Sequence, residues 1–165
     1  MNKLKRNSAF LLSAIVIVIL DQITKELVRA NMYPGQSIPS DSWVRLTYVT
    51  NTGGAFGILQ GQSLFILVTT IIGVVAILLY YIFPPVNSWL LTTALGLQFG
   101  GALGNLVDRI RLGHVTDFID FRVWPVFNLA DSAIVVGVAT LTIFVFFIDR
   151  ERPSIDRSKI ERSPE

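Results

Sequence analysis

The sequence predicts an all-α integral membrane protein: four transmembrane helices with a small extracytoplasmic β-sheet and loop subdomain. Three observations support this prediction. Hydrophobic residues make up 52% of the 165 residues and charged residues only 16%, whereas soluble domains carry about 25% charged residues. Four apolar runs are long enough for the roughly 20 residues that a helix needs to cross a bilayer. Between the first two runs, the chain alternates between apolar and polar residues as a strand does.

The first apolar run covers residues 9–28 and is interpreted as a retained helix. Three basic residues precede it, as at the start of a secretory signal peptide. However, Asp21 and Lys25 follow the apolar core directly, a cleavage site of small residues is missing, and three more runs come after. We therefore expect a membrane span here.

The loop from 29 to 62 is too long for a simple turn. Within it, residues 42–49 alternate and are rich in β-branched and aromatic side chains, which predicts a strand. Residues 51–57 (Asn-Thr-Gly-Gly-Ala-Phe-Gly) then allow a tight turn with close backbone approach. We expect a small sheet on the outer leaflet; a plain loop anchored by aromatic side chains is the alternative.

The second and third runs differ in composition. Residues 63–83 carry no charge and stop at two prolines. Residues 87–107 are rich in glycine and alanine, with glycine at every fourth position from 96 to 104. Such a stripe lets another helix approach closely. We expect it to serve packing within the chain; dimerisation is the alternative.

The fourth run, residues 127–148, contains Asp131 near its start and is apolar beyond it. A second outer loop, residues 108–126, connects it to the third run. Residues 1–148 are thus expected to form one four-helix domain. The charged residues 149–165 contain proline and serine and are expected to form a disordered cytoplasmic tail.

Basic residues set the expected orientation. Three precede the first run and five follow the fourth, so both termini are expected in the cytoplasm. This orientation places three arginines on the extracytoplasmic side, although basic residues are usually enriched in cytoplasmic loops. Neighbouring aspartates can pair with them there; the three are Arg109, Arg111 and Arg122. Clustering of charge at the chain ends also argues against a nucleic-acid partner.

Polar residues gather at the outer end of the expected bundle. A carboxylate within a span costs roughly 2.5–3.5 kcal/mol and is usually kept for function. The second and third runs carry no charge in their middles, where a proton pathway would need one. The outer cluster comprises Asp21, Lys25, Asn105, Asp108, Arg109, Asp117, Asp120, Asn128 and Asp131.

These residue types favour acid–base chemistry by two carboxyl groups. The chain has no cysteine and one histidine, which excludes a thiol nucleophile and disfavours zinc. We expect no metal and no cofactor; a hard cation held by the four outer aspartates is the alternative. Two adjacent carboxyls cannot both ionise easily, so one keeps a proton near neutral pH. The pattern alone leaves open whether Asp117 or Asp120 is the partner of Asp131. It also leaves open that the loop aspartates only pair with arginines.

Five blocks of the chain resemble, in order, the bacterial lipoprotein signal peptidases. The resemblance covers residues 21–132 and the four-span layout, and leaves the tail outside. Gly54 stands where alanine is also common in that family. The blocks are Asp-Gln-Ile-Thr-Lys (21–25), Asn-Thr-Gly-Gly-Ala-Phe-Gly (51–57), Gly-Gly-Ala-Leu-Gly-Asn-Leu-Val-Asp-Arg (100–109), Val-Thr-Asp-Phe-Ile-Asp-Phe (115–121) and Phe-Asn-Leu-Ala-Asp-Ser (127–132).

The resemblance implies an intramembrane aspartyl endopeptidase of the bacterial cytoplasmic (inner) membrane, with its active site near the outer leaflet. It would remove the signal peptide from diacylglyceryl-modified prolipoproteins, just before the lipidated cysteine. Membrane lipids and globomycin-type inhibitors are the other implied partners. Asp117 and Asp131 are implied as the catalytic pair, and Asp21 and Lys25 as structural support. Residues implied around the substrate and the pair are Asn51, Gly54, Asn105, Asp108, Arg109, Asn128 and Ala130.

Two other function classes compete with this one. A small proton-coupled membrane transporter would need ionisable groups at mid-membrane depth. A non-enzymatic membrane scaffold packed through the glycine stripe would tolerate Asp117→Asn and Asp131→Asn. A further hypothesis is that the turn around Gly54 folds over the site and excludes water.

Overall fold

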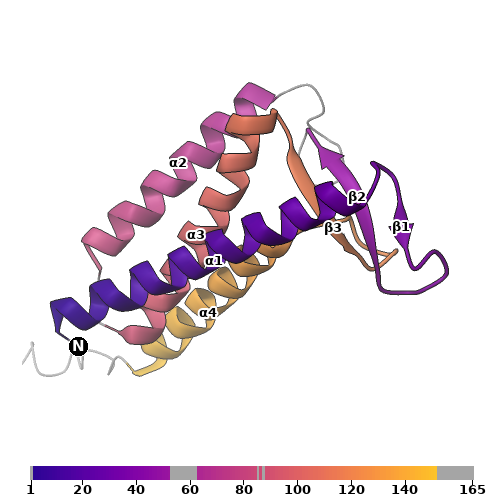
Figure 1. Ribbon diagram of the computed structural model, residues 1–165. Coiled ribbons are helices and arrows are strands. Elements are labelled where there is room, and N and C mark those ends of the chain that lie inside the picture. The colour runs from indigo at the N-terminus through magenta and orange to yellow at the C-terminus, as the bar shows by residue number, and fades with distance from the viewer. Residues whose placement is uncertain (1, 53–62, 85, 87, 152–165) are drawn as a thin grey trace, which may run out of the picture.

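The computed structural model describes residues 2–52, 63–84, 86 and 88–151 (Figure 1). Within them, four helices and a three-stranded antiparallel sheet confirm the predicted fold class. The N-terminus and the sheet lie at opposite ends of the helical bundle (Figure 1). The elements are α1 (Lys3–Asn31), β1 (Ser37–Ile38), β2 (Arg45–Asn51), α2 (Ser63–Ile82), α3 (Trp89–Leu112), β3 (Val115–Asp120) and α4 (Leu129–Glu151).

Three of the helices are long and apolar enough to cross a membrane: residues Leu64–Ile82, Trp89–Leu112 and Leu129–Phe146. The fourth, α1, is the longest, with 29 residues and a length of roughly 44 Å. It continues past both ends of the predicted span, 9–28, and its C-terminal part packs against β3. The polar residues that follow its apolar core therefore lie on a continuous helix.

The centre of the bundle is α3, which packs against α1, α2 and α4. Its glycines make this possible. A Cβ added at Gly100 would lie 2.6 Å from the carbonyl oxygen of Ala14, and one at Gly96 would lie 2.7 Å from that of Phe10. Both contacts are shorter than side chains tolerate, so the stripe serves close packing of α3 on α1, as expected.

The two connections predicted as outer loops contain more regular structure than the sequence pattern indicates. Residues 108–126 are predicted as a loop, but α3 continues to Leu112 and β3 begins at Val115. Gly113, with a φ of 76°, ends α3 and lets the chain turn directly into the strand. The predicted strand at 42–49 lies instead at Arg45–Asn51 and pairs with both β1 and β3. Strand pairing depends on contacts between residues distant in the sequence, so the local pattern does not show that this connection contains a strand.

At the other end of the chain, α4 continues to Glu151, beyond the predicted start of the tail at residue 149. The rest of the predicted tail, residues 152–165, lies outside the described residues. The glycine-rich turn falls there too, because the described part of the loop stops at Thr52 and resumes at Ser63.

Candidate active site

Asp117 and Asp131 face one cavity at the sheet end of the bundle. Asp117 lies on β3 and Asp131 lies in the first turn of α4. We call this space, of about 300 Å³, the aspartate cavity. Its lining residues are Asn51, Asn105, Arg109, Val115, Asp117, Trp124, Pro125, Val126, Phe127 and Asp131.

The chain after β3 folds back and brings the start of α4 beside the strand. Phe127 pairs with Ile119: the Ile119 amide donates to the Phe127 carbonyl (2.7 Å), and the Phe127 amide donates back (3.1 Å). Asn128 therefore reaches the strand, where its Nδ2 donates to Asp117 Oδ1 at 2.6 Å. This return of the backbone places the two aspartates on the same cavity.

Local sequence determines how α4 begins. The Asp131 amide donates to Asn128 Oδ1 (2.9 Å), and the Asn128 amide donates to Asp131 Oδ2 (3.3 Å). This reciprocal pair has the form of a capping box, in which residues three apart satisfy each other's free amides. The positive end of the helix dipole also favours a negative charge in the first turn. The sequence Asn-Leu-Ala-Asp thus holds the Asp131 carboxylate at the helix start.

Two further asparagines hold the carboxylates. Asn51, the last residue of β2, donates through Nδ2 to Asp117 Oδ2 at 2.8 Å. Asn105, on α3, donates through Nδ2 to Asp131 Oδ1 at 2.7 Å. Neutral amides orient the carboxylates without cancelling their charge. Three elements and the start of a fourth thus contribute to one small group of polar side chains.

The environment of Asp117 changes its protonation. Its side chain is almost completely buried, and Asp131 lies close by. Burial and the charge of Asp131 raise the pKa of Asp117 to about 7, although hydrogen bonds from Asn51 and Asn128 act in the opposite direction. At neutral pH, the two carboxyls can therefore hold one proton between them.

Lys25 lies behind Asn105, with no exposed surface. Its Nζ contacts Asp21 Oδ2 at 2.8 Å and Asn105 Oδ1 at 2.9 Å. An ammonium can only donate hydrogen bonds, so the oxygen of the Asn105 amide faces Lys25 and the NH2 faces Asp131. Asp21 Oδ1 in turn accepts a hydrogen bond from the Ala130 amide at 3.0 Å. Lys25 thereby determines the orientation of the amide that contacts Asp131.

Asp108 completes what we call the ion-paired layer, which comprises Asp21, Lys25, Arg29 and Asp108. Asp108 Oδ2 lies 3.6 Å from both Lys25 Nζ and Arg29 Nη1. It also accepts the amide of Thr116 at 3.0 Å. These contacts connect α1, α3 and β3 beneath the cavity.

The predicted substrate residues therefore occupy different depths. Asn51, Asn105 and Arg109 line the cavity, and Asn128 is fully buried between the two aspartates. Asp108 and Ala130 are buried one step deeper, where their contacts are with the protein. Gly54 lies outside the described residues.

Asp120 lies on the opposite face of β3 from Asp117, because side chains alternate along a strand. It accepts hydrogen bonds from Arg45 Nε (2.6 Å), Thr47 Oγ1 (2.6 Å) and the Arg122 amide (2.7 Å). Burial acts to raise the pKa of Asp120, but these hydrogen bonds outweigh it and hold the pKa below its ordinary value. For this aspartate, pairing with arginine is the observed arrangement.

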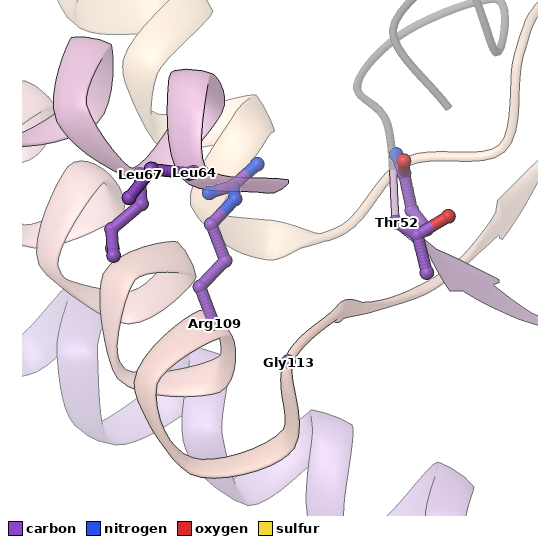
Figure 2. Close-up of a pocket in the computed structure, with 6 residues that line it drawn as sticks. Thr52, Leu64, Leu67, Arg109 and Gly113 are labelled. Atoms are coloured by element: carbon purple, nitrogen blue, oxygen red, sulfur yellow. The ribbon is translucent and has the colours of Figure 1, made fainter. Parts of the chain in front are cut away.

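Arg109 borders a second cavity of about 260 Å³ between α2, α3 and the end of β2. Figure 2 shows its guanidinium extending toward Leu64 and Leu67. The same side chain lines the aspartate cavity, so it separates the two spaces. Its position allows contact with a peptide in either.

Sequence reasoning missed several members of this site. Arg29 of the ion-paired layer was not predicted, nor was Thr116, whose Oγ1 accepts a hydrogen bond from Arg29 Nη1 at 2.9 Å. Gln22 Nε2 lies within 3.2 Å of both Asp21 Oδ2 and Asp108 Oδ1. Gln22 and Thr116 lie within the sequence blocks that resemble the signal peptidases, and this position could have identified them as members of the site. Across the described residues, we find no group of three histidine, cysteine, aspartate or glutamate side chains placed to hold a metal.

Comparison with known proteins gives consistent matches. The family profile Peptidase_A8, described as signal peptidase (SPase) II, matches residues 13–147. A lipoprotein signal peptidase of Halothermothrix orenii is 47% identical over 133 residues, covering 80% of this chain and 91% of the relative. One from Moorella thermoacetica is 47% identical over 134 residues, covering 80% and 89%.

The fold has a solved counterpart as well. A bacterial membrane enzyme, determined by the in meso method at 2.3 Å resolution, superimposes with a TM-score of 0.80 and 34% sequence identity. The match covers 89% of this chain and 92% of that chain. The four-helix arrangement with its small sheet is therefore that of a multi-pass membrane enzyme.

Proposed function

The chain belongs to the signal peptidase II family of aspartic peptidases, which process prolipoproteins, and from that premise we propose that Asp117 and Asp131 are its catalytic pair. The observation that carries the proposal is their placement on one cavity, bridged by Asn128 and each oriented by a further asparagine. Because the chain belongs to this peptidase family, the transporter and scaffold alternatives are set aside.

The proposed reaction divides the two roles by environment. Asp131, at the positive end of α4 and hydrogen-bonded by Asn105, is the ionised base that takes a proton from water. Asp117, whose pKa is about 7, supplies the proton. It polarises the scissile carbonyl while the water oxygen attacks, and then protonates the leaving amine.

The substrate is proposed to be a prolipoprotein whose cysteine already carries diacylglycerol, cut on the N-terminal side of that cysteine. Asn51 and Arg109 line the cavity where the peptide main chain would lie. The half-buried guanidinium of Arg109 carries several N–H donors and is well suited to hydrogen-bond the carbonyl groups of a peptide in the cavity. Globomycin-type inhibitors are proposed to occupy the same cavity.

We propose a bacterial cytoplasmic membrane location with both termini in the cytoplasm. The distribution of basic residues supports it, as does the separation of the N-terminus from the sheet along the bundle (Figure 1). The aspartate cavity then lies near the outer leaflet. Gly54 is proposed to allow the turn after β2 to cover the site, and Gly54→Phe should lower turnover; unchanged turnover would contradict that role.

The central test replaces each aspartate by asparagine in purified enzyme, with a diacylglyceryl-modified prolipoprotein as substrate. Loss of general acid–base catalysis should lower the cleavage rate by about a hundredfold to ten-thousandfold for Asp117→Asn and for Asp131→Asn. Asp120→Asn, on the other face of the same strand, is the matched control and should keep most of the activity. We call Asp117 and Asp131 the dyad. Normal cleavage by either asparagine variant, in protein that unfolds at the wild-type temperature, would refute the assignment of the catalytic pair.

A further inference from the structure

An apolar groove adjoins the aspartate cavity. It has a volume of about 440 Å³ and shares Trp124, Phe127 and Asp131 with the cavity, so the two spaces are continuous at one member of the dyad. We call it the α4 groove. Its lining residues are Phe121, Trp124, Phe127, Asp131, Ser132, Val135 and Val136.

The groove runs from the polar site onto the face of α4 that lipid covers. Ser132, Val135 and Val136 are three and four positions apart and therefore share one face of the helix. Val135 is 66% exposed and Val136 is 53% exposed, within the apolar span Leu129–Phe146. In a membrane span, exposed valines contact hydrocarbon. One end of the groove is thus the Asp131 carboxylate, and the other opens to the bilayer.

We propose that the α4 groove binds a hydrocarbon chain of the diacylglycerol attached to the substrate cysteine. This inference rests on the proposed function. When the scissile carbonyl lies between Asp117 and Asp131, the lipidated cysteine is the next residue, so its glyceryl group begins beside the dyad. The acyl chains must then pass from the polar aspartate cavity into the surrounding lipid. Within the part of the chain that the structure describes, the α4 groove is an apolar exit that starts at the dyad itself.

The second cavity beside the site is a poorer exit. It is lined by Arg109, Asn51 and Thr52 together with Leu64, Leu67 and Gly113. Figure 2 shows the Arg109 guanidinium extending toward the two leucines, so the charge lies among the apolar lining residues. A hydrocarbon chain there would bury a cation against apolar atoms, which is costly. In the α4 groove the charged group, Asp131, lies at the dyad end, and aromatic and valine side chains line most of the rest. The position of the charge therefore makes the α4 groove the better path for hydrocarbon.

The contribution of the groove is positional. Lipid tails are as apolar as valine, so a chain gains little hydrophobic free energy on moving from bilayer to groove. A chain held against α4, however, restrains the cysteine to which it is attached. Small displacements of a reacting bond cost large factors in rate. The groove should therefore make cleavage depend on acyl chain length.

The test fills the groove and compares two substrates that differ only in chain length. Val136→Trp places an indole in the groove. Val138→Trp is the matched control: it is the same substitution on the same helix, at a residue that is 46% exposed and outside the groove lining. Cleavage rates are measured for the same prolipoprotein peptide carrying either two sixteen-carbon or two four-carbon chains.

We expect Val136→Trp to lower the ratio of long-chain to short-chain rates by about tenfold, with the short-chain rate kept. Val138→Trp should keep the wild-type ratio. An unchanged ratio in Val136→Trp, or an equal change in both variants, would overturn the inference and leave bulk lipid as the occupant of the groove. An equal loss with both substrates would overturn it as well. A dependence on the signal-peptide sequence without a change in the ratio would assign the groove to the peptide instead.

Failure of the proposed function gives a different result. Activity that survives in Asp117→Asn and Asp131→Asn would remove the dyad whatever the chain-length ratio shows. A retained dyad with an unchanged ratio in Val136→Trp would remove the α4 groove alone. The two hypotheses are therefore tested separately in one assay.

Discussion

Two pairs of aspartates lie at the same end of the bundle but have different partners. Asp21 and Asp108 belong to the ion-paired layer, where both contact the ammonium of Lys25. Asp117 and Asp131 accept hydrogen bonds from the neutral amides of asparagines. The first pair is neutralised by cations, whereas the second is only oriented.

This difference separates structural from chemical roles. The carboxylates of Asp21 and Asp108 connect α1 with α3, β3 and the start of α4 through ion pairs with Lys25 and hydrogen bonds to the backbone amides of Ala130 and Thr116. A carboxylate held by amides beside another carboxylate binds a proton near neutral pH, as the pKa of about 7 for Asp117 shows. Asn105 joins the two regions, because its oxygen contacts Lys25 and its nitrogen contacts Asp131.

Removing the cation of the ion-paired layer should have the largest effect. Lys25→Met leaves Asp21 and Asp108 buried beside each other without their shared ammonium, which should cost about 3–5 kcal/mol of stability. Thermal unfolding of purified protein measures it. Glu26→Gln, one position along α1, is the control: it weakens only the exposed ion pair of Glu26 with Arg29 and should cost about 1 kcal/mol or less. Equal melting temperatures for Lys25→Met and wild type would show that this layer is not structural.

Breaking the link between the two regions should reduce both catalysis and stability, because Asn105 Oδ1 also accepts hydrogen bonds from the buried Lys25 and Asn128. Asn105→Leu removes the donor to Asp131, and we expect kcat to fall about a hundredfold, as when other oriented donors are removed. Gln98→Leu, on the same helix and also buried, is the matched control. It should keep its activity, since Gln98 lies two turns away from the dyad. Equal activity of the two variants would mean that Asn105 does not position Asp131.

The dyad region should show its shared proton in the pH profile. Because Asp117 must be protonated to act as the acid and its pKa is about 7, kcat/KM should fall as pH rises through about 7. Asn51→Leu removes a hydrogen bond that favours the charged form, so it should move this descending limb to higher pH. Asp120→Asn should leave the limb in place. A shift to lower pH in Asn51→Leu would contradict the assignment of the acid.

The smallest effect is expected at the sheet, where an ion pair lies near solvent. Arg45→Met removes one of three donors to Asp120 and should cost about 1 kcal/mol or less. The pKa of Asp120 lies below its ordinary value. Its contribution is therefore present above an ordinary aspartate pKa and is lost as pH falls through the lowered value. Unfolding measured at neutral and acidic pH should show the difference between variant and wild type disappear in acid.

The sequence was a good guide to the helices and a poor one to the sheet. Apolar runs of about 20 residues identify membrane helices because the bilayer requires that length. The third strand, Val115–Asp120, cannot be distinguished from a loop by local sequence. Its pairing with β2 joins residues that lie about 70 positions apart. Its β-branched and aromatic residues favour a strand, but the sequence Val-Thr-Asp-Phe-Ile-Asp lacks a regular alternation of apolar and polar residues.

The sequence predicts which residues belong to the site, but it does not predict which of them contact one another. The five matched blocks contain Asp21, Lys25, Asn105 and both catalytic candidates. Which of them meet depends on how the helices are rotated and how closely α3 approaches its neighbours. The contact between Lys25 and Asn105, 80 positions apart, follows from the glycine stripe and from no property of either residue alone.

By itself, the sequence determined a four-helix membrane protein, its family and the residues from which a site is built, because hydropathy and local patterns act over short stretches of chain. Tertiary structure alone decided that Lys25 neutralises one pair of aspartates and that amides hold the other. The physical reason is that protonation depends on distances between groups from different helices. Those distances exist only when α1, α3, α4 and the sheet are packed together.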